Sequence, residues 1–229
     1  MLVALGSIGA NQSKGTQTTA DACIHLLNYC ATHPNAVLQF TASNMILHVH
    51  SDVSYLSEPG ARSRAGGFFF LSKDQDVAPA DAPPVPINGA IHVISKIMNN
   101  VMASATEAEV GALFHNCQDA CMLRNTLEFL GHPQPATPVQ TDNACANGIA
   151  NDTVKQKSSK AIDMRFYWIR DRVRQGQFKI HWKRGKDNHG DYCTKHFPAS
   201  HHREVRPVFL HETPHTTTEF ASMLQQMPL

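Results

Sequence analysis

The chain has 229 residues, 42% of them hydrophobic, which is enough for one well-packed domain with an appendage. No apolar run approaches the roughly 18 to 20 residues of a membrane span, and the first residues lack the basic flank and long apolar core of a secretory signal. We therefore expect an intracellular protein with no membrane partner. The net charge is only +1, but between Lys155 and Lys186 eleven Lys or Arg residues stand against two acids, which favours a polyanionic partner over a solvated helix face.

The two ends of the chain differ in composition from its middle. Residues 1–16 are rich in Gly, Ser and Gln and predict coil, and the apolar stripe that follows predicts a helix ending near His33. This N-terminal part is interpreted as an appendage or the remnant of a preceding domain. Beyond His196 the sequence turns to His, Pro and Thr, so we expect residues 198–229 to be an irregular tail.

The middle of the chain alternates between strand and helix patterns. The predicted strands are, in order, 46–52, 66–71, 90–94, 139–141 and 178–182, and the main predicted helices are 104–131 and 159–175. Turns join the first three strands into an antiparallel meander. The fourth strand arrives after a helical crossover, so we expect it to lie parallel to an existing strand.

Four acidic residues occupy the ends of these elements. Asp52 is expected at the exit of the first strand and Asp142 at the exit of the fourth, so parallel neighbours would place both at one edge of the sheet. Glu109 lies in the first turns of the long helix, and Asp191 follows the last strand. Carboxylates so close repel one another unless a cation is present. Hard oxygen ligands suit Mg²⁺ or Mn²⁺, and two such ions would support hydrolysis of a phosphodiester.

Three alternatives compete with this interpretation. His48, His50 and Asp52 alternate on one strand and could form a zinc trio, but strand histidines more often pack or are solvated. The six scattered cysteines contain no C-x-x-C pair and are interpreted as small core residues. A lone carboxylate at the end of a strand is usually a solvated turn residue. For Asp52, a metal-binding role is favoured only because the other three acids are expected near it.

Five segments resemble, in order and spacing, the ribonuclease H domain of reverse transcriptases from copia-type LTR retrotransposons. They are HSDVSYL, SATEAEVGAL, PVQTDNACANGIAN, SKAIDMRFYWIRDRVRQGQFKIHW and NHGDYCTKHF. The resemblance covers residues 46–197, and residues 1–45 resemble the connection that follows the polymerase thumb. It implies an α/β, ribonuclease H-like fold, in which helices flank a mixed five-stranded sheet of three antiparallel strands followed by parallel ones.

The resemblance also implies an activity, which is cleavage of the RNA strand of RNA–DNA hybrids with two divalent ions, Mg²⁺ or Mn²⁺. The acidic tetrad of the family falls on Asp52, Glu109, Asp142 and Asp191. Glu109 is preferred over Glu107 because its sequence context matches that of the family's glutamate. His189 is too close to Asp191 to be the obvious counterpart of the product-release histidine of some relatives, and His181 lies in a strand, so that role stays open.

A hybrid presents phosphates on both strands and 2′-hydroxyls on one. The candidate substrate-binding residues are Arg165, Arg172, Lys183, Arg184 and Lys186 for phosphates and Asn143 for the scissile region. Each basic residue has the alternative of being an ordinary solvated side chain.

The expected partners are an RNA–DNA hybrid and a reverse transcriptase polymerase domain, which this chain does not contain. Its expected location is the cytoplasm, in a virus-like particle, or the nucleus. A rival hypothesis is a catalytically idle domain that binds nucleic acid or stabilises a polymerase subunit. A third is an integrase or exonuclease with the same fold and metals but another substrate.

Overall fold

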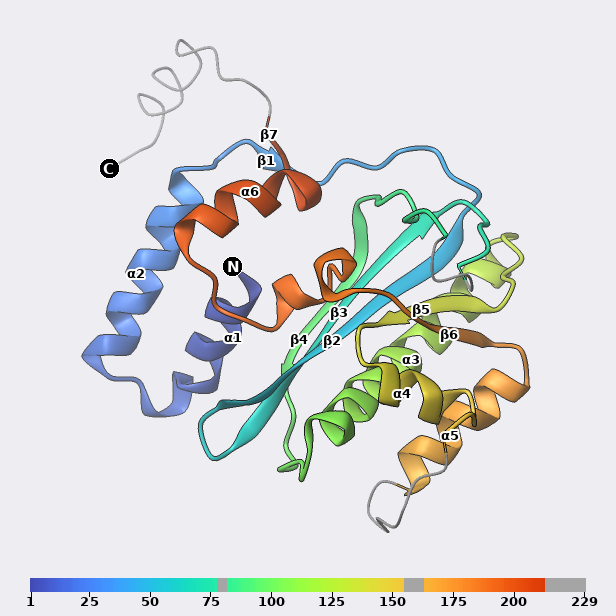
Figure 1. Ribbon diagram of the computed structural model, residues 1–229. Helices are drawn as coiled ribbons and strands as arrows, with labels where there is room; N and C mark the ends of the chain where they lie inside the picture. Colours follow the sequence, from blue (N-terminus) through green and yellow to red (C-terminus); the bar gives the residue numbers. More distant parts are fainter. Residues whose placement is uncertain (78–81, 155–162, 213–229) are drawn as a thin grey trace.

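The computed structural model describes residues 1–77, 82–154 and 163–212 (Figure 1). Its centre is a five-stranded sheet with the strand order β4–β3–β2–β5–β6. The strands are β2 (Ile46–Glu58), β3 (Arg62–Ser72), β4 (Ala90–Ile97), β5 (Thr137–Thr141) and β6 (Phe178–Trp182). The first three are antiparallel, and β5 and β6 run parallel to β2. This arrangement confirms the predicted α/β class with a mixed five-stranded sheet.

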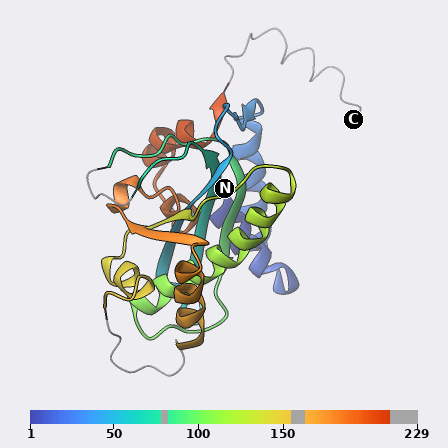
Figure 2. The same ribbon diagram turned by 90° about the vertical axis from the view of Figure 1, so that its right-hand side faces the viewer.

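Helices α3 (Ala105–Phe129), α4 (Ala144–Ala150) and α5 (Asp163–Arg174) pack together on the sheet (Figure 2). The long helix α3 begins after Ser104, whose hydroxyl accepts a hydrogen bond from the backbone N–H of Glu107. The part of the predicted helix before Asp163 lies outside the described residues. Among the described helices, none is both long and apolar enough to cross a membrane.

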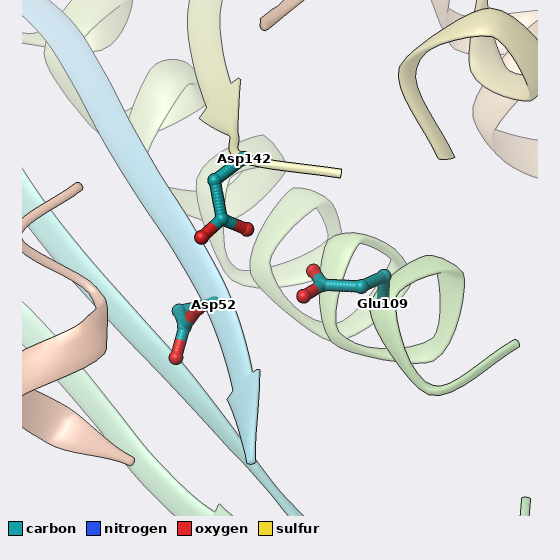
Figure 3. Close-up of side chains that lie close together, drawn as sticks. All are labelled: Asp52, Glu109 and Asp142. Carbon is teal, nitrogen blue, oxygen red and sulfur yellow. The ribbon is translucent and has the colours of Figure 1, made fainter. Parts of the chain in front are cut away.

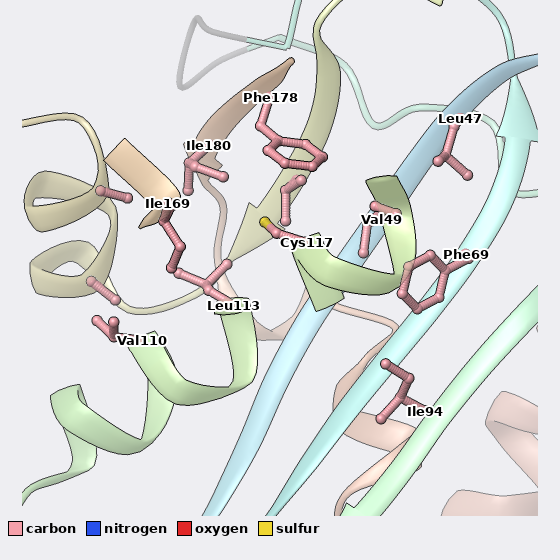
Figure 4. Packing of buried hydrophobic residues seen from close by; sticks show 14 of the residues in the cluster. Leu47, Val49, Phe69, Ile94, Val110, Leu113, Cys117, Ile169, Phe178 and Ile180 are labelled. Carbon is pink, nitrogen blue, oxygen red and sulfur yellow. The ribbon is translucent and has the colours of Figure 1, made fainter. Parts of the chain in front are cut away.

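The core between the sheet and α3 follows from the period-two alternation of the strands. Leu47 and Val49 of β2 and Phe69 of β3 point toward Leu113 and Cys117 of α3, and all five side chains have no solvent exposure (Figure 4). Fully burying side chains of this size contributes roughly 1.5–3 kcal/mol each to folding. The same alternation sends the intervening residues of β2 to the opposite face of the sheet.

The start of the chain differs from the prediction. Residues 2–10, expected as coil, form helix α1 (Leu2–Ala10), whose Val3 is buried. The guanidinium group of Arg64, fully buried in β3, donates a hydrogen bond to the hydroxyl of Ser7 at 3.2 Å. This non-local contact holds α1 against the sheet and has no signature in the local composition. The following helix, α2 (Gln17–Ala31), confirms the predicted one.

The irregular tail expected over 198–229 is wrong for its first part, because residues Ala199–Phe209 form helix α6. This helix lies beside α2 in Figure 1, and Arg206 of α6 contacts both His33 and Glu212. A short two-stranded sheet of β1 (Ala36–Val37) and β7 (His211–Glu212) closes the arrangement. The expectation for residues 213–229 falls outside the described residues.

Asp52 lies within a strand rather than at its exit, which corrects the prediction. Strand β2 continues to Glu58 because its hairpin partner β3 begins only at Arg62, and Asp52 pairs with Gly66 of β3. The local alternation ends near Leu56, which has a positive φ of 52°. The predicted strand ended at residue 52, six residues before the observed end of β2.

Two glycines of β3 let other elements approach the sheet beside Asp52. A Cβ on Gly66 would overlap Thr194, and a Cβ on Gly67 would overlap the side-chain oxygen of Asn116 in α3. Asn116 is fully buried, and its amide donates to the Ser51 hydroxyl at 2.8 Å and to the Gly66 carbonyl at 2.9 Å. Close packing at Gly67 thus fixes the position of α3, and with it that of Glu109, two turns away on the same helix.

We expect Gly67→Ala to lower the free energy of unfolding by about 3 kcal/mol, because the added methyl group must displace the buried Asn116. Urea denaturation followed by circular dichroism measures the change. The matched control is Gly9→Ala in α1, where a Cβ would meet no atom within 4 Å. The control should be as stable as the wild type or slightly more so. Equal stability of the two variants would contradict the packing described for Gly67.

Candidate metal centre

Three carboxylates from distant parts of the chain meet at the point where β5 ends. The side chains of Asp52, Glu109 and Asp142 offer oxygen atoms that all lie within 4.8 Å of one another (Figure 3). The parallel register pairs His50 with Gln140, so that Asp142, two residues further along, is level with Asp52. Because β2 continues beyond the end of β5, the first turns of α3 can bring Glu109 to the same point.

Burial gives these carboxylates unusual proton affinities. Desolvation, followed by the nearby charges of Asp52 and Asp142, raises the pKa of Glu109 to about 9. Desolvation also raises the pKa of Asp52 to about 7, against an opposing hydrogen bond from Thr194, and burial raises the pKa of Asp142. The three groups therefore cannot all be ionised at neutral pH without a compensating cation.

The donor set fits a divalent metal ion. Oε2 of Glu109 is buried and has no hydrogen-bond partner among the described residues, so an acceptor points into the cluster unused. All three groups are hard oxygen donors, the type that suits Mg²⁺ and Mn²⁺. Across the described parts of the chain, no other group of three or more His, Cys, Asp or Glu ligand atoms lies so close together. The zinc trio of His48, His50 and Asp52 is thus not formed.

Asp191 lies at the rim of the cluster and not among the three. It begins the short helix η3 (Asp191–Cys193), and its carboxylate accepts a hydrogen bond from the ammonium group of Lys195. Its charge nevertheless contributes to the raised pKa of Asp52 and of Asp142. The structure thus brings together three of the four predicted acids and places the fourth next to them, paired with a lysine.

Thr194 is a site residue that the sequence analysis missed. Its hydroxyl donates to Oδ2 of Asp52 at 2.5 Å, and its side chain is only 2% exposed. Gly66 provides the space for this approach, since a Cβ there would overlap the Thr194 methyl group. The sequence does not indicate that a threonine three residues after a predicted metal ligand contacts another ligand. Only Asp191 had marked this segment as part of the site.

We expect Thr194→Val to weaken Mn²⁺ binding by about tenfold, because loss of a partner that orients a ligand typically costs 10–100-fold in metal affinity. Titration calorimetry measures the affinity. Thr194→Ser keeps the hydroxyl and should bind as the wild type does. If the Val and Ser variants bind Mn²⁺ equally, the hydroxyl does not orient Asp52.

The loop after β6 approaches Asp142 from the other side. A Cβ on Gly185 would come within 2.9 Å of Oδ2 of Asp142, and the indole N–H of Trp182 donates to the Asp142 carbonyl at 2.9 Å. The predicted phosphate-binding residues of this loop divide into two kinds. Lys183 donates to the Ala82 carbonyl, whereas Arg184 and Lys186 are exposed. This loop therefore carries positive charge beside the carboxylates, and Trp182, which was not predicted, fixes the backbone of Asp142.

The other predicted substrate-binding residues have contacts away from the cluster. The guanidinium group of Arg165 lies over the Phe114 ring at 5.9 Å, and that of Arg172 over the Trp168 ring at 5.2 Å. The side-chain oxygen of Asn143 accepts from the Ala146 N–H and caps α4. Their role in binding a substrate stays a prediction.

The two histidines considered for product release are a buried residue of β6, His181, and a partly buried loop residue, His189. His189 donates its backbone N–H to Nδ1 of His50 at 3.2 Å, and the two rings stack. Burial lowers the pKa of His189 and lowers that of His181 to about 4. Burial therefore favours the neutral form of both imidazoles, and neither lies among the three clustered carboxylates.

Comparison with known proteins finds relatives both in sequence and in structure. No family model matches the chain. It is 26% identical over 175 residues to the Retrovirus-related Pol polyprotein from transposon TNT 1-94 of Nicotiana tabacum, a match that spans 76% of this chain and 12% of that polyprotein. This relative confirms the predicted resemblance to a retrotransposon polyprotein.

Among solved structures, LC11-RNase H1 in complex with RNA/DNA hybrid matches 65% of the chain and 93% of its own length, with 14% identity and a TM-score of 0.46. The Prototype Foamy Virus protease-reverse transcriptase matches 65% of the chain and 20% of its own length, with 14% identity and a TM-score of 0.38.

Proposed function

We propose that the chain is a metal-dependent ribonuclease H of a retrotransposon, which hydrolyses the RNA strand of RNA–DNA hybrids. The observation that carries this proposal is the cluster of Asp52, Glu109 and Asp142, whose oxygens lie within 4.8 Å of one another in a buried setting that disfavours their ionisation without a cation. The similarity to a Pol polyprotein of a transposon supports the retrotransposon origin in this proposal.

In this proposal, Asp52, Glu109 and Asp142 hold Mg²⁺ or Mn²⁺, and Asp191 completes the ligand set for a second ion. When bound, such ions supply Lewis acidity and an activated water for displacement at phosphorus. The protein itself orients Asp52 through Thr194 and fixes the backbone of Asp142 through Trp182. In the same proposal, Lys183, Arg184 and Lys186 bind phosphates from the loop whose Gly185 approaches Asp142.

The partners and location of the whole polyprotein are likewise proposals. The chain spans 12% of the length of its Nicotiana tabacum relative, which is named as a Pol polyprotein. We therefore propose that a reverse transcriptase polymerase domain supplies the hybrid on which this domain acts. This would occur in a cytoplasmic virus-like particle or in the nucleus.

The test is digestion of a hybrid labelled on either strand in Mg²⁺, by the wild type and by Asp52→Asn. The proposal expects the wild type to fragment the RNA strand, to leave the DNA strand intact and to spare duplex DNA, and the variant to cleave neither strand. Binding of the hybrid without cleavage by the wild type would instead support the idle nucleic-acid-binding domain. Cleavage of duplex DNA would support another nuclease of this fold.

A further inference from the structure

A groove of about 480 Å³ lies between the N-terminal helix and the segment that carries Thr194, which contacts Asp52. One wall is α1, which contributes Ser7 and Asn11, and the other is the β2–β3 hairpin, which contributes Ser57 and Arg62. The floor near the cluster is formed by the segment that follows η3. With Ile97 of β4, the groove is thus built from four parts of the chain.

Two residues of the groove lining, Ser54 and Thr194, lie next to Asp52 of the cluster. Ser54 lies two residues beyond Asp52 on β2, and the period-two alternation places both side chains on the same face of the sheet. Thr194 also lines the groove while its hydroxyl contacts the Asp52 carboxylate. A nucleic-acid strand lying in this groove would therefore pass close to the candidate metal centre.

The chemistry of the lining suits a phosphodiester backbone. Arg62 supplies positive charge, Lys195 adds an ammonium group that is paired with Asp191, and His196 adds an imidazole. The acid in the lining, Glu58, is already compensated by the buried Arg64, whose Nε lies 2.6 Å from its carboxylate. The described lining contains no Phe, Tyr or Trp ring on which a base could stack, so the groove offers donors for phosphate oxygens and not a platform for bases.

Helix α1 is held firmly enough to serve as a wall of this groove. Arg64 is fully buried and donates to the hydroxyl of Ser7, which keeps its own proton free to donate to a ligand. A Cβ on Gly6 would overlap this guanidinium group, so a glycine is needed for α1 to lie so close. The side-chain amide of Asn11 donates to the Ser7 carbonyl, which keeps the end of the helix in place.

We propose that this groove binds the phosphodiester backbone of one strand of the nucleic acid, with α1 as one of its walls. Helix α1 lies outside the part of the chain for which a nuclease domain is predicted, so the proposal extends the substrate site to this helix. The inference rests on the proposed function for the identity of the ligand.

The experiment measures binding of a fluorescently labelled RNA–DNA hybrid by anisotropy in Ca²⁺, at several salt concentrations. The variant is Asn11→Asp combined with Arg62→Glu, which reverses the charge of the groove and touches none of the clustered carboxylates. We expect it to bind the hybrid at least tenfold more weakly and with a smaller dependence of log Kd on log salt, because contacts to phosphate are lost.

The matched control is Lys96→Glu on β4. Lys96 lies between Ser95, which contacts Arg64, and Ile97, which lines the groove, so alternation places Lys96 on the opposite face of the sheet. Its charge acts there on His115 of α3. This variant carries the same reversal of a basic residue to Glu as Arg62→Glu, without the added carboxylate of Asn11→Asp, and should bind the hybrid within about twofold of the wild type.

The possible results distinguish a failure of the groove proposal from a failure of the proposed ribonuclease activity. If the double variant has the wild-type circular dichroism spectrum, Kd and salt dependence, the groove proposal is overturned, whether or not the protein is a nuclease. If the variant binds weakly but the wild type never cleaves the hybrid, the groove stands and the ribonuclease activity fails. Should the double variant not fold, Arg62→Gln alone must weaken binding at least threefold, and unchanged binding by that variant overturns the proposal.

Discussion

Glu109→Gln is expected to lower the rate of hybrid cleavage in Mg²⁺ by about a thousandfold or more. The amide cannot carry the negative charge that a divalent ion requires, and the loss of several kcal/mol of stabilisation at the reacting phosphate corresponds to this factor. The side chain is nearly isosteric, and Glu109 is protonated in the metal-free protein at neutral pH, with a pKa of about 9. The variant should therefore fold as the wild type does.

The control for this prediction lies two residues away on the same helix. Glu107 accepts a hydrogen bond from the Ala103 N–H at 2.7 Å and lies in the first turn of α3, where its charge supports the start of the helix. Glu107→Gln makes the same chemical change and should retain cleavage within a few-fold of the wild type. Single-turnover kinetics on a labelled hybrid compares the two variants. If both variants cleave equally well, or Glu107→Gln alone is inactive, the assignment of Glu109 is wrong.

The stability of the metal-free protein is expected to fall as the pH rises from 7 to 9, and Mg²⁺ is expected to reverse this loss. The folded-state pKa values of Asp52, about 7, and of Glu109, about 9, both exceed the unfolded values near 4. The folded state then binds more protons than the unfolded state in this window, so the free energy of unfolding decreases with pH. Buried histidines contribute little above pH 7, because burial lowers the pKa of His50 and of His181 below the ordinary value.

A bound divalent ion takes the place of these protons. At a concentration a hundred times its Kd it stabilises the fold by about 2.7 kcal/mol, which corresponds to a rise in Tm of about 5 to 10 °C for a chain of this size. Differential scanning calorimetry in EDTA and in Mg²⁺ at pH 6.5 and pH 8.5 measures the effect. The Mg²⁺-induced shift should be larger at pH 8.5, and Glu109→Gln should abolish most of the difference. A shift that is equal at both pH values, or larger at pH 6.5, would contradict the coupling.

The sequence predicts those parts of the fold that depend on local periodicity and on simple connection rules. Alternation over 46–50 and 178–182 predicted strands that the structure contains, and the crossover rule predicted that β5 lies parallel to an existing strand, which in the structure is β2. That rule is also the reason why Asp142 could be expected beside Asp52 before any coordinates were known. Helix α3 was predictable for the same reason, because its cap at Ser104 and its apolar spacing are local features.

The features that could not be predicted depend on contacts between residues distant in sequence. Helix α1 is held by the buried Arg64, and α6 by its contacts with α2, neither of which leaves a mark on the local pattern. The contact between Thr194 and Asp52 joins residues 142 positions apart. The pairing of Asp191 with Lys195 is a detail of side-chain geometry that no strand or helix pattern contains.

The most direct test of the candidate metal centre is anomalous diffraction from crystals of the protein soaked in Mn²⁺. An anomalous peak at coordination distance from the carboxylate oxygens of Asp52, Glu109 and Asp142 is the expected result, and it should be absent from crystals of Glu109→Gln. Well-ordered crystals in which Mn²⁺ occupies other positions while these three carboxylates stay unliganded would contradict the account.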